Sequence, residues 1–209
     1  LWQREMLGDD HDEDSVLGRQ IAFWRRELDG MPHLLNLPTD RPHPSVPSGA
    51  GGIVDLWLDD TTVAGLRAVA ARHGVTLFAV FHSALAVVLS RLADSDDIAI
   101  GTAISGRDDP KLAGVIGMFV NTVVLRTHVD ESDSVAALLT SAHRVRSRAM
   151  SNGDAPFEQV VSALGATRSR AHTPLFGVEL VMQHDHVAHV LGADPRFDVL
   201  DARVRSATY

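Results

Sequence analysis

A run of apolar and β-branched residues, GVIGMFVNTVVLR at positions 114–126, predicts the central strand of a β-sheet. Strand alternation divides the run into two faces, one with Phe119, Asn121, Val123 and Leu125 and the other with Met118, Val120, Thr122 and Val124. Asn121 is therefore expected among large apolar side chains, where an amide without hydrogen-bond partners costs roughly 1 to 3 kcal/mol. Two hypotheses follow: Asn121 fixes the backbone of a neighbouring loop, or it lines a site.

The segment 98–105, IAIGTAIS, also predicts a strand, but only one of its faces carries large side chains. The large face consists of Ile98, Ile100, Thr102 and Ile104, and the bare face of Ala99, Gly101, Ala103 and Ser105. A bare face lets a helix pack very close, or it leaves space for a narrow channel that ends at the Ser105 hydroxyl. The sequence leaves both interpretations open.

Apolar residues at helical spacing predict helices in five segments. These are 15–30, 60–74, 75–92, 132–149 and 156–161, with caps expected at Ser15, at Asp60 or Thr61, and at Ser132 or Asp133. Shorter strands are predicted at 53–58, 176–182 and 197–204, and the stretch 31–52 is rich enough in Pro and Gly to predict an irregular connector. The predicted class is α/β.

Composition narrows the possible functions. With 209 residues, 45% of them hydrophobic, the chain can bury one large core, as a domain or as one lobe of a larger one. A net charge of −8 argues against binding to a nucleic-acid backbone. The absence of cysteine excludes disulfides, thiolate metal sites and a Cys nucleophile, and it suits a reducing, cytoplasmic location. The acidic start does not resemble a signal peptide, and the apolar run 75–89 is too short to cross a bilayer.

Motifs that would carry chemistry are scarce. The sequence contains no GxSxG, P-loop or GxGxxG motif. His184, His186 and His189 follow a predicted strand into a polar segment, so a solvated loop is favoured over a metal site. The arginines at 144, 146 and 148 predict a solvated helix face near a helix C-terminus, with a partner site as the alternative.

Several strings, taken in order, resemble one family. WQRE, FWRRELDG, LNLPTDRP, DDIAIGTAISGR, IGMFVNTVVLR, NGDAPFEQVV and SRAHTPLFGVELVMQ resemble the C-terminal half of a condensation domain from a nonribosomal peptide synthetase. The resemblance covers nearly the whole chain. It implies a chloramphenicol-acetyltransferase-like lobe, a mixed β-sheet packed with helices, in a domain whose two lobes meet in a V around a substrate tunnel.

The family signature HHxxxDG belongs to the other, N-terminal lobe, and no two histidines are adjacent in this sequence. Residues 1–209 are therefore expected to form the C-terminal subdomain, with no catalytic residue of their own and the general-base histidine in the other lobe. The resemblance implies supporting roles in the tunnel wall for four residues. These are Asn121 and Gly117 of the string IGMFVNT, and Ser105 and Arg107 of the SGR turn. Two departures, NGDA before PFE and the segment QHDHVAHV, leave the subtype open.

The function implied by the resemblance is amide formation between an upstream carrier-bound acyl or peptidyl thioester and a downstream carrier-bound aminoacyl group. It implies no cofactor bound by the domain itself, because the substrates travel on the phosphopantetheine of carrier domains. The expected partners are the N-terminal lobe, donor and acceptor peptidyl carrier domains and an adjacent adenylation domain. The alternatives are an inactive, condensation-like recruitment module and an epimerising or ester-forming relative.

Overall fold

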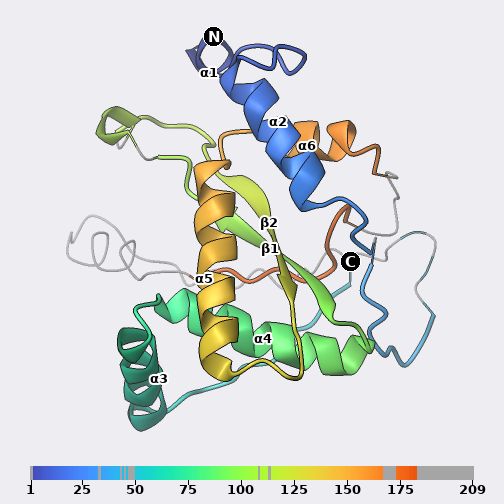
Figure 1. Cartoon of the computed structure of the whole chain (residues 1–209), viewed down its shortest axis with the longest axis vertical. Helices are drawn as coiled ribbons and strands as arrows, with labels where there is room; N and C mark the ends of the chain where they lie inside the picture. The colour runs from blue at the N-terminus through green and yellow to red at the C-terminus, as the bar shows by residue number, and fades with distance from the viewer. Residues whose placement is uncertain are drawn as a thin grey trace.

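A computed structural model describes residues 2–32, 34–42, 44, 46, 50–107, 109–112, 114–166 and 173–182. Along these residues the elements are α1 (Trp2–Leu7), α2 (Val16–Glu27), α3 (Asp60–Arg72), α4 (Leu77–Ala93), β1 (Asp97–Ile104), the 3-10 helix η1 (Pro110–Leu112), β2 (Asn121–His128), α5 (Val135–Ser151) and α6 (Phe157–Ala163). Figure 1 shows α5 running along the β1–β2 ribbon, with α4 across its lower end and α2 and α6 at its upper end. This mixture of helices and sheet confirms the predicted α/β class.

The sheet is built on β1. Strands β1 and β2 pair antiparallel, with Ile100 opposite Leu125 and Ile104 opposite Asn121. On its other side β1 meets the predicted strand 176–182 through a parallel bridge between Gly101 and Glu179. The Gly101 amide donates to the Val178 carbonyl oxygen at 2.9 Å, and the Leu180 amide donates to that of Gly101 at 2.9 Å. The segment 176–182 is thus a sheet neighbour of β1, although its pairing extends over a single bridge.

The two faces of β1 are both filled. Ile98 and Ile100 pack with Ala86 and Leu89 of α4. On the bare face, a Cβ added to Gly101 would lie 2.4 Å from the ring of Phe176, so the ring occupies the space that a side chain would need. The close-packing interpretation is therefore correct at Gly101, but an aromatic ring fills the face there and not a helix.

Helix caps follow the sequence signals closely. Ser15 caps α2 as predicted, its Oγ accepting from the Gly18 amide at 2.8 Å. The prediction was wrong by one or two residues at α3 and α5, which are capped by Asp59 and Ser134. In each case a neighbouring Asp or Ser could make the same hydrogen bond, and tertiary packing selects among them.

Two strand predictions need correction. The central strand begins only at Asn121, and 114–120 is irregular, with Ile116 fully exposed. The segment 53–58 has no assigned secondary structure, and Val54 and Trp57 are 95% and 87% exposed. Its composition suits a strand, but a strand forms only beside a hydrogen-bonded neighbour, and none of the strands described here pairs with it. The predicted strand 197–204 and the histidines 184, 186 and 189 lie outside the described residues.

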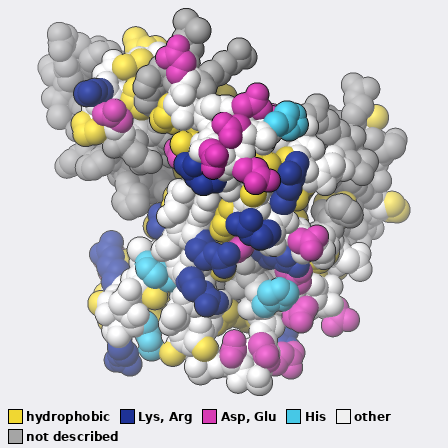
Figure 2. All heavy atoms as spheres, turned by 45° about the horizontal axis from the view of Figure 1, so that its top comes forward, with side chains coloured by type: hydrophobic (Ala, Val, Ile, Leu, Met, Phe, Trp, Pro, Cys, Tyr) yellow, Lys and Arg dark blue, Asp and Glu magenta, His cyan; other side chains and the backbone are white. Residues whose placement is uncertain are grey.

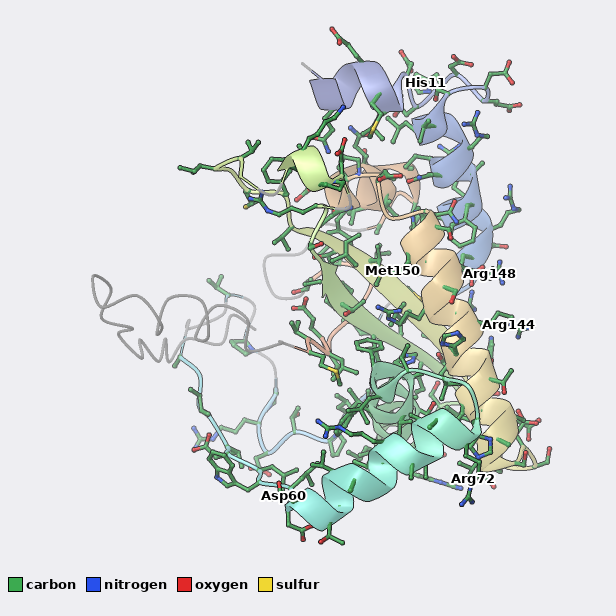
Figure 3. The ribbon with its side chains drawn as sticks, turned by 90° about the vertical axis from the view of Figure 1, so that its left-hand side faces the viewer. His11, Asp60, Arg72, Arg144, Arg148 and Met150 are labelled. Atoms are coloured by element: carbon green, nitrogen blue, oxygen red, sulfur yellow. The ribbon has the colours of Figure 1, made fainter. Side chains whose placement is uncertain are left out.

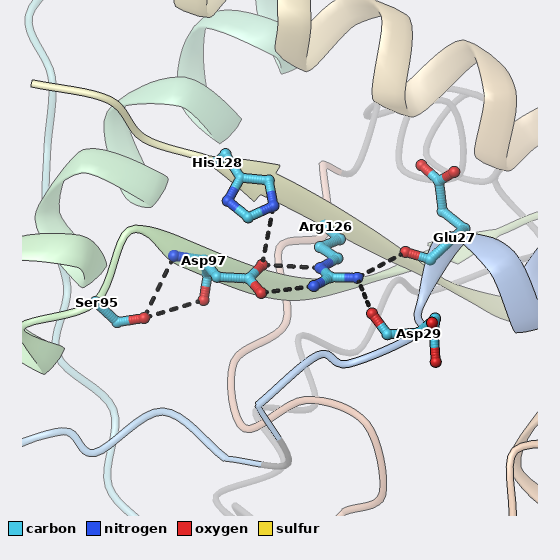
Figure 4. A network of polar contacts seen from close by, with 6 residues as sticks. All are labelled: Glu27, Asp29, Ser95, Asp97, Arg126 and His128. Atoms are coloured by element: carbon cyan, nitrogen blue, oxygen red, sulfur yellow. Dashed lines mark hydrogen bonds and ion pairs between the residues drawn. The ribbon is translucent and has the colours of Figure 1, made fainter. Parts of the chain in front are cut away.

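One ionic network joins the sheet to α2 (Figure 4). Arg126 of β2 donates from Nε and Nη2 to the two carboxylate oxygens of Asp97 at 2.9 and 2.8 Å, and these side chains are only 16% and 12% exposed. Its Nη1 donates to the carbonyl oxygens of Glu27 and Asp29, at 3.1 and 2.7 Å. The hydrogen bonds to Asp97 raise the pKa of Arg126 above its ordinary value. A single cation thus ties β1, β2 and the C-terminal end of α2 together.

Replacing Arg126 by Ala is expected to lower the free energy of unfolding by about 3 to 5 kcal/mol, since it leaves the largely buried Asp97 carboxylate without its counter-ion. Chemical denaturation measures the change. Arg91→Ala is the matched control, because Arg91 pairs with Glu131 where both side chains are more than half exposed. This control should lose at most about 1 kcal/mol. Equal losses for the two variants would contradict the role given to Arg126.

Within the described residues no single helix is long and apolar enough to cross a membrane. Only α3 and α4 taken together, with a bend of 103° between them, reach that length and apolarity.

Helix α4 carries a buried histidine in the middle of the core. His82 is 0% exposed, and neither of its ring nitrogens has a hydrogen-bond partner among the residues that the structure describes. It stacks on Phe78 with ring centroids 6.1 Å apart. Burial lowers the pKa of His82 from 6.5 to about 4, because the imidazolium would be desolvated.

The folded chain therefore binds fewer protons at His82 than the unfolded chain does between pH 6.5 and about 4. The contribution of His82 to the pH dependence is therefore a loss at low pH. The free energy of unfolding keeps its full value above pH 6.5 and falls by about 3 kcal/mol as the pH decreases from 6.5 to about 4. Denaturation at several pH values should show that His82→Leu removes this part of the pH dependence. His73→Leu, at the exposed C-cap of α3, is the control and should leave it in place. An unchanged pH profile in His82→Leu would refute this prediction.

Candidate functional site

The side chain of Asn121 holds the loop between α5 and α6. Its Nδ2 donates to the carbonyl oxygens of Gly153 and Ala155, both at 2.8 Å. Its Oδ1 accepts from the Phe157 amide at 3.1 Å, at the first residue of α6. The cap residue of α6, Pro156, makes no side-chain cap hydrogen bond, so Asn121 supplies the missing acceptor from β2. The loop-fixing hypothesis for Asn121 is confirmed.

The same loop is held from its other side by α2. Gln20 accepts from the Ala155 amide at 2.7 Å and donates to the Asp154 carboxylate at 2.9 Å. The indole of Trp24 donates to the Asn152 carbonyl oxygen at 2.9 Å. Both side chains are buried, and the hydrogen bond between Gln20 and the Ala155 amide is made away from water, whereas Asp154 itself is exposed. The sequence analysis missed Gln20, although a polar residue inside the apolar stripe of a helix is a usable signal.

A second clamp organises the loop between β1 and β2. The guanidinium of Arg107 donates to the carbonyl oxygens of Leu112, Val115 and Gly117, at 2.5, 2.9 and 3.1 Å. It also lies over the ring of Phe119, 4.2 Å from the ring centroid. Two of these carbonyls, those of Val115 and Gly117, belong to the segment 114–120, so a side chain binds them where a neighbouring strand was expected.

A glycine makes the close approach of this loop possible. Gly106 has φ +61°, and a Cβ there would lie 2.0 Å from the Phe119 carbonyl oxygen. No other residue type fits that position without moving the backbone. Gly117 is less constrained: a Cβ there would be 3.2 Å from the Phe119 ring. The sequence analysis named Gly117 and missed Gly106.

The four predicted site residues lie at one end of the β1–β2 pair. Ser105 follows β1 directly, is exposed, and its Oγ accepts from the Arg107 amide at 3.4 Å. Asn121 begins β2 opposite the last residue of β1. Arg107 and Gly117 meet in the loop between them. Their roles in a substrate tunnel stay predictions, since the geometry itself establishes loop clamping.

The described residues offer no acid–base chemistry at this end of the sheet. Ser105 has no histidine or carboxylate among its hydrogen-bond partners, so nothing there activates it as a nucleophile. The described parts of the chain also contain no group of three or more His, Cys, Asp or Glu residues placed to hold a metal. What this arrangement of the described residues can do is hold two loops in a fixed shape.

The family model for the condensation domain matches residues 2–209. The chain belongs to the condensation domain family. A probable non-canonical nonribosomal peptide synthetase, CymA, of Salinispora arenicola is 42% identical over 200 residues, which are 95% of this chain and 3% of that protein. The isonitrile lipopeptide synthase of Mycobacterium tuberculosis is 41% identical over 190 residues, 91% of this chain and 8% of that protein. The chain thus spans only a small part of the curated relatives that it matches.

Solved structures share the fold. The X-domain from teicoplanin biosynthesis superposes with a TM-score of 0.80 at 28% identity, covering 85% of this chain and 40% of that chain. A four-domain nonribosomal peptide synthetase bound to AMP and glycine superposes with a TM-score of 0.82 at 23% identity, covering 90% of this chain and 14% of that chain. The second likeness concerns the fold alone. Both agree with the chloramphenicol-acetyltransferase-like lobe expected from the sequence.

Replacing Asn121 by Ala is expected to lower the free energy of unfolding by about 1 to 3 kcal/mol, because the two carbonyl oxygens and one amide of the loop lose their partner. Thermal or chemical unfolding measures the loss. Asn152→Ala is a matched control, since its amide bonds only to the Arg148 carbonyl oxygen at an exposed position. A normal thermal midpoint for Asn121→Ala would show that the clamp is not what this side chain contributes.

Proposed function

We propose that residues 1–209 are the C-terminal lobe of a condensation domain that forms an amide bond between two carrier-bound substrates. The observation that carries this proposal is the extent of the match: it covers residues 2–209, whereas the similar teicoplanin X-domain is matched over 40% of its own length. The motif HHxxxDG is absent from the sequence. The general base is accordingly assigned to the other lobe.

In the proposed reaction, the amine of a downstream carrier-bound aminoacyl group attacks the carbonyl of an upstream carrier-bound thioester. A C–N bond forms and the C–S bond breaks, so that the acyl or peptidyl group moves to the amine. The sulfur of the upstream carrier leaves as a thiolate, and the base takes one proton from the amine and passes it to this sulfur, which ends as a thiol. The substrates ride on phosphopantetheine of the carrier domains, and the lobe itself is assigned no cofactor.

The role proposed for this lobe is to form one wall of the tunnel. Ser105 is exposed at the end of β1, while Arg107 and Asn121 fix the loops on either side of it. A wall whose loops are held by side-chain clamps keeps its shape while substrates pass, and this preorganisation favours productive alignment of amine and thioester. Gly117 contributes through its carbonyl oxygen, which Arg107 holds.

Two exposed apolar segments support contact with the other lobe. In 114–120, Ile116 and Met118 are 100% and 93% exposed, and in 53–58 the side chains of Val54, Leu56 and Trp57 are largely exposed. Soluble proteins rarely leave contiguous apolar surface of this kind uncovered. We assign both segments to the interface between the lobes.

Carrier and adenylation domains are the partners proposed for the complete protein, because one relative, from Bacillus subtilis, is named a dimodular nonribosomal peptide synthase and one similar structure is that of a four-domain synthetase. The alternatives, an inactive recruitment module and an epimerising or ester-forming relative, have no observation of their own in their favour.

The proposal predicts size-selective inhibition when the tunnel wall is enlarged. In the complete domain, Ser105→Phe should reduce condensation with a large acceptor at least about tenfold more than with a glycine-sized acceptor. Because Ser105 is exposed, the thermal stability should change by no more than about 0.5 kcal/mol. Product formation is measured by mass spectrometry of the downstream carrier, and stability by thermal unfolding.

Ser162→Phe is the matched control, because Ser162 is an exposed serine of α6 without a side-chain hydrogen bond among the described residues. It should leave both acceptors unaffected. Equal loss for both acceptors together with a lower thermal midpoint in Ser105→Phe would remove Ser105 from the tunnel. Amide formation by residues 1–209 alone would overturn the assignment of the base to the other lobe.

A further inference from the structure

The adjoining faces of α2 and α5 are basic in a chain of net charge −8. Within the bounds of these two helices the sequence has six arginines and a single acidic residue, Glu27, and α5 contains no Asp or Glu at all. Figure 2 looks at this side of the molecule and shows Lys and Arg side chains gathered over its middle, bordered by acidic side chains. The solvated-face interpretation explains why these arginines are exposed, but not why they are collected on neighbouring helices.

One arginine of this face is held in a fixed position. Arg148 donates to the Glu27 carboxylate at 2.5 Å and lies over the Phe23 ring, 5.4 Å from its centroid. These contacts join α5 to α2, yet the Arg148 side chain remains 53% exposed. Its outer edge therefore points to solvent with little conformational entropy left to lose on binding.

Two further arginines of these helices are exposed to solvent. Neither Arg144 nor Arg26 makes a hydrogen bond or ion pair with any part of the chain that the structure describes, and both are exposed. Arg146, by contrast, turns away, with its guanidinium over Phe78 at 5.2 Å. We define the basic face as Arg144 and Arg148 of α5 together with Arg26 of α2, which directly precedes Glu27, the partner of Arg148.

The spacing of the arginines on α5 is regular (Figure 3). Arg144 and Arg148 stand four residues apart, which is about 6 Å along a helix axis. The exposed residue between them, Ser147, is small, so a second helix can approach closely. Glutamates at i and i+4 on such a helix repeat at the same interval.

We propose that the face formed by Arg26, Arg144 and Arg148 docks an acidic helix of another protein domain, with carboxylates at i and i+4 opposite Arg144 and Arg148. A protein helix is favoured over duplex DNA, because the net charge of −8 of the chain as a whole opposes binding to a phosphate backbone. The inference does not depend on the reaction proposed above, since it rests on charge and geometry alone.

The test measures binding of two fluorescent helical peptides to the full chain at about 0.1 M salt, where charges interact over about 10 Å. One peptide carries its glutamates at i and i+4, and the other has the same composition with the glutamates distributed around the helix. The first should bind at least about threefold more tightly to the wild-type chain. Arg144→Glu should weaken its binding about threefold to tenfold.

Arg67→Glu is the matched control, because Arg67 is an exposed arginine of α3 that makes no hydrogen bond or ion pair with the described residues. It changes the net charge equally and should alter binding less than about twofold. Far-UV circular dichroism verifies the fold of each variant, and Arg26→Glu serves as a second variant if Arg144→Glu does not fold. Equal losses in Arg144→Glu and Arg67→Glu, equal binding of the two peptides, or tighter binding of duplex DNA would each overturn the proposal.

Discussion

The α5–α6 loop depends on one constraint: a backbone that turns inside the protein must find hydrogen-bond partners for its polar groups. The loop cannot find them in a regular ladder, because it turns sharply between two helices. Asn121 supplies two donors and one acceptor from β2, Gln20 and Trp24 supply one acceptor and one donor from α2, and the amides of Asn152 and Gly153 bond to the end of α5. The packing of α2, α6 and the sheet follows from this solution, because all three elements must meet at the loop for the hydrogen bonds to form.

Arg126 solves a related problem at the opposite end of β2. The carbonyl oxygens of Glu27 and Asp29 end α2 without helical partners, and a helix C-terminus attracts positive charge. A guanidinium in that position requires a counter-ion once it is largely buried, and Asp97 provides it in bidentate geometry. Asn121 and Arg126 thus lie near opposite ends of β2, and each organises one of two separate places where α2 is held to the sheet. Removing either side chain should loosen α2 from the sheet at the corresponding place.

The sequence predicted five of the six α-helices that the structure describes, missing α1, because most helix signals are local. A cap residue, an apolar stripe and a terminating glycine such as Gly74, which has φ +62°, all lie within a few residues of one another. It predicted the loop-fixing role of Asn121 for a physical reason as well, since a buried amide must be satisfied. It failed at 114–120, where the Arg107 side chain binds the carbonyl oxygens of Val115 and Gly117, and at 53–58, which pairs with none of the described strands. Periodicity cannot show that a side chain takes the place of a strand as the partner of a carbonyl oxygen.

The same limit applies to chemistry. Asn121, Arg107 and Gly106 stiffen one end of the sheet, and none of them can transfer a proton there. The function proposed above divides stiffness and catalysis between different parts of a domain. It assigns to these three residues an effect on the reaction only through the shape that they hold. A larger side chain at Ser105 changes that shape, whereas loss of the Asn121 side chain frees the loop. Ser105→Phe should therefore mainly alter the selectivity for acceptor size, and Asn121→Ala should mainly lower the free energy of unfolding.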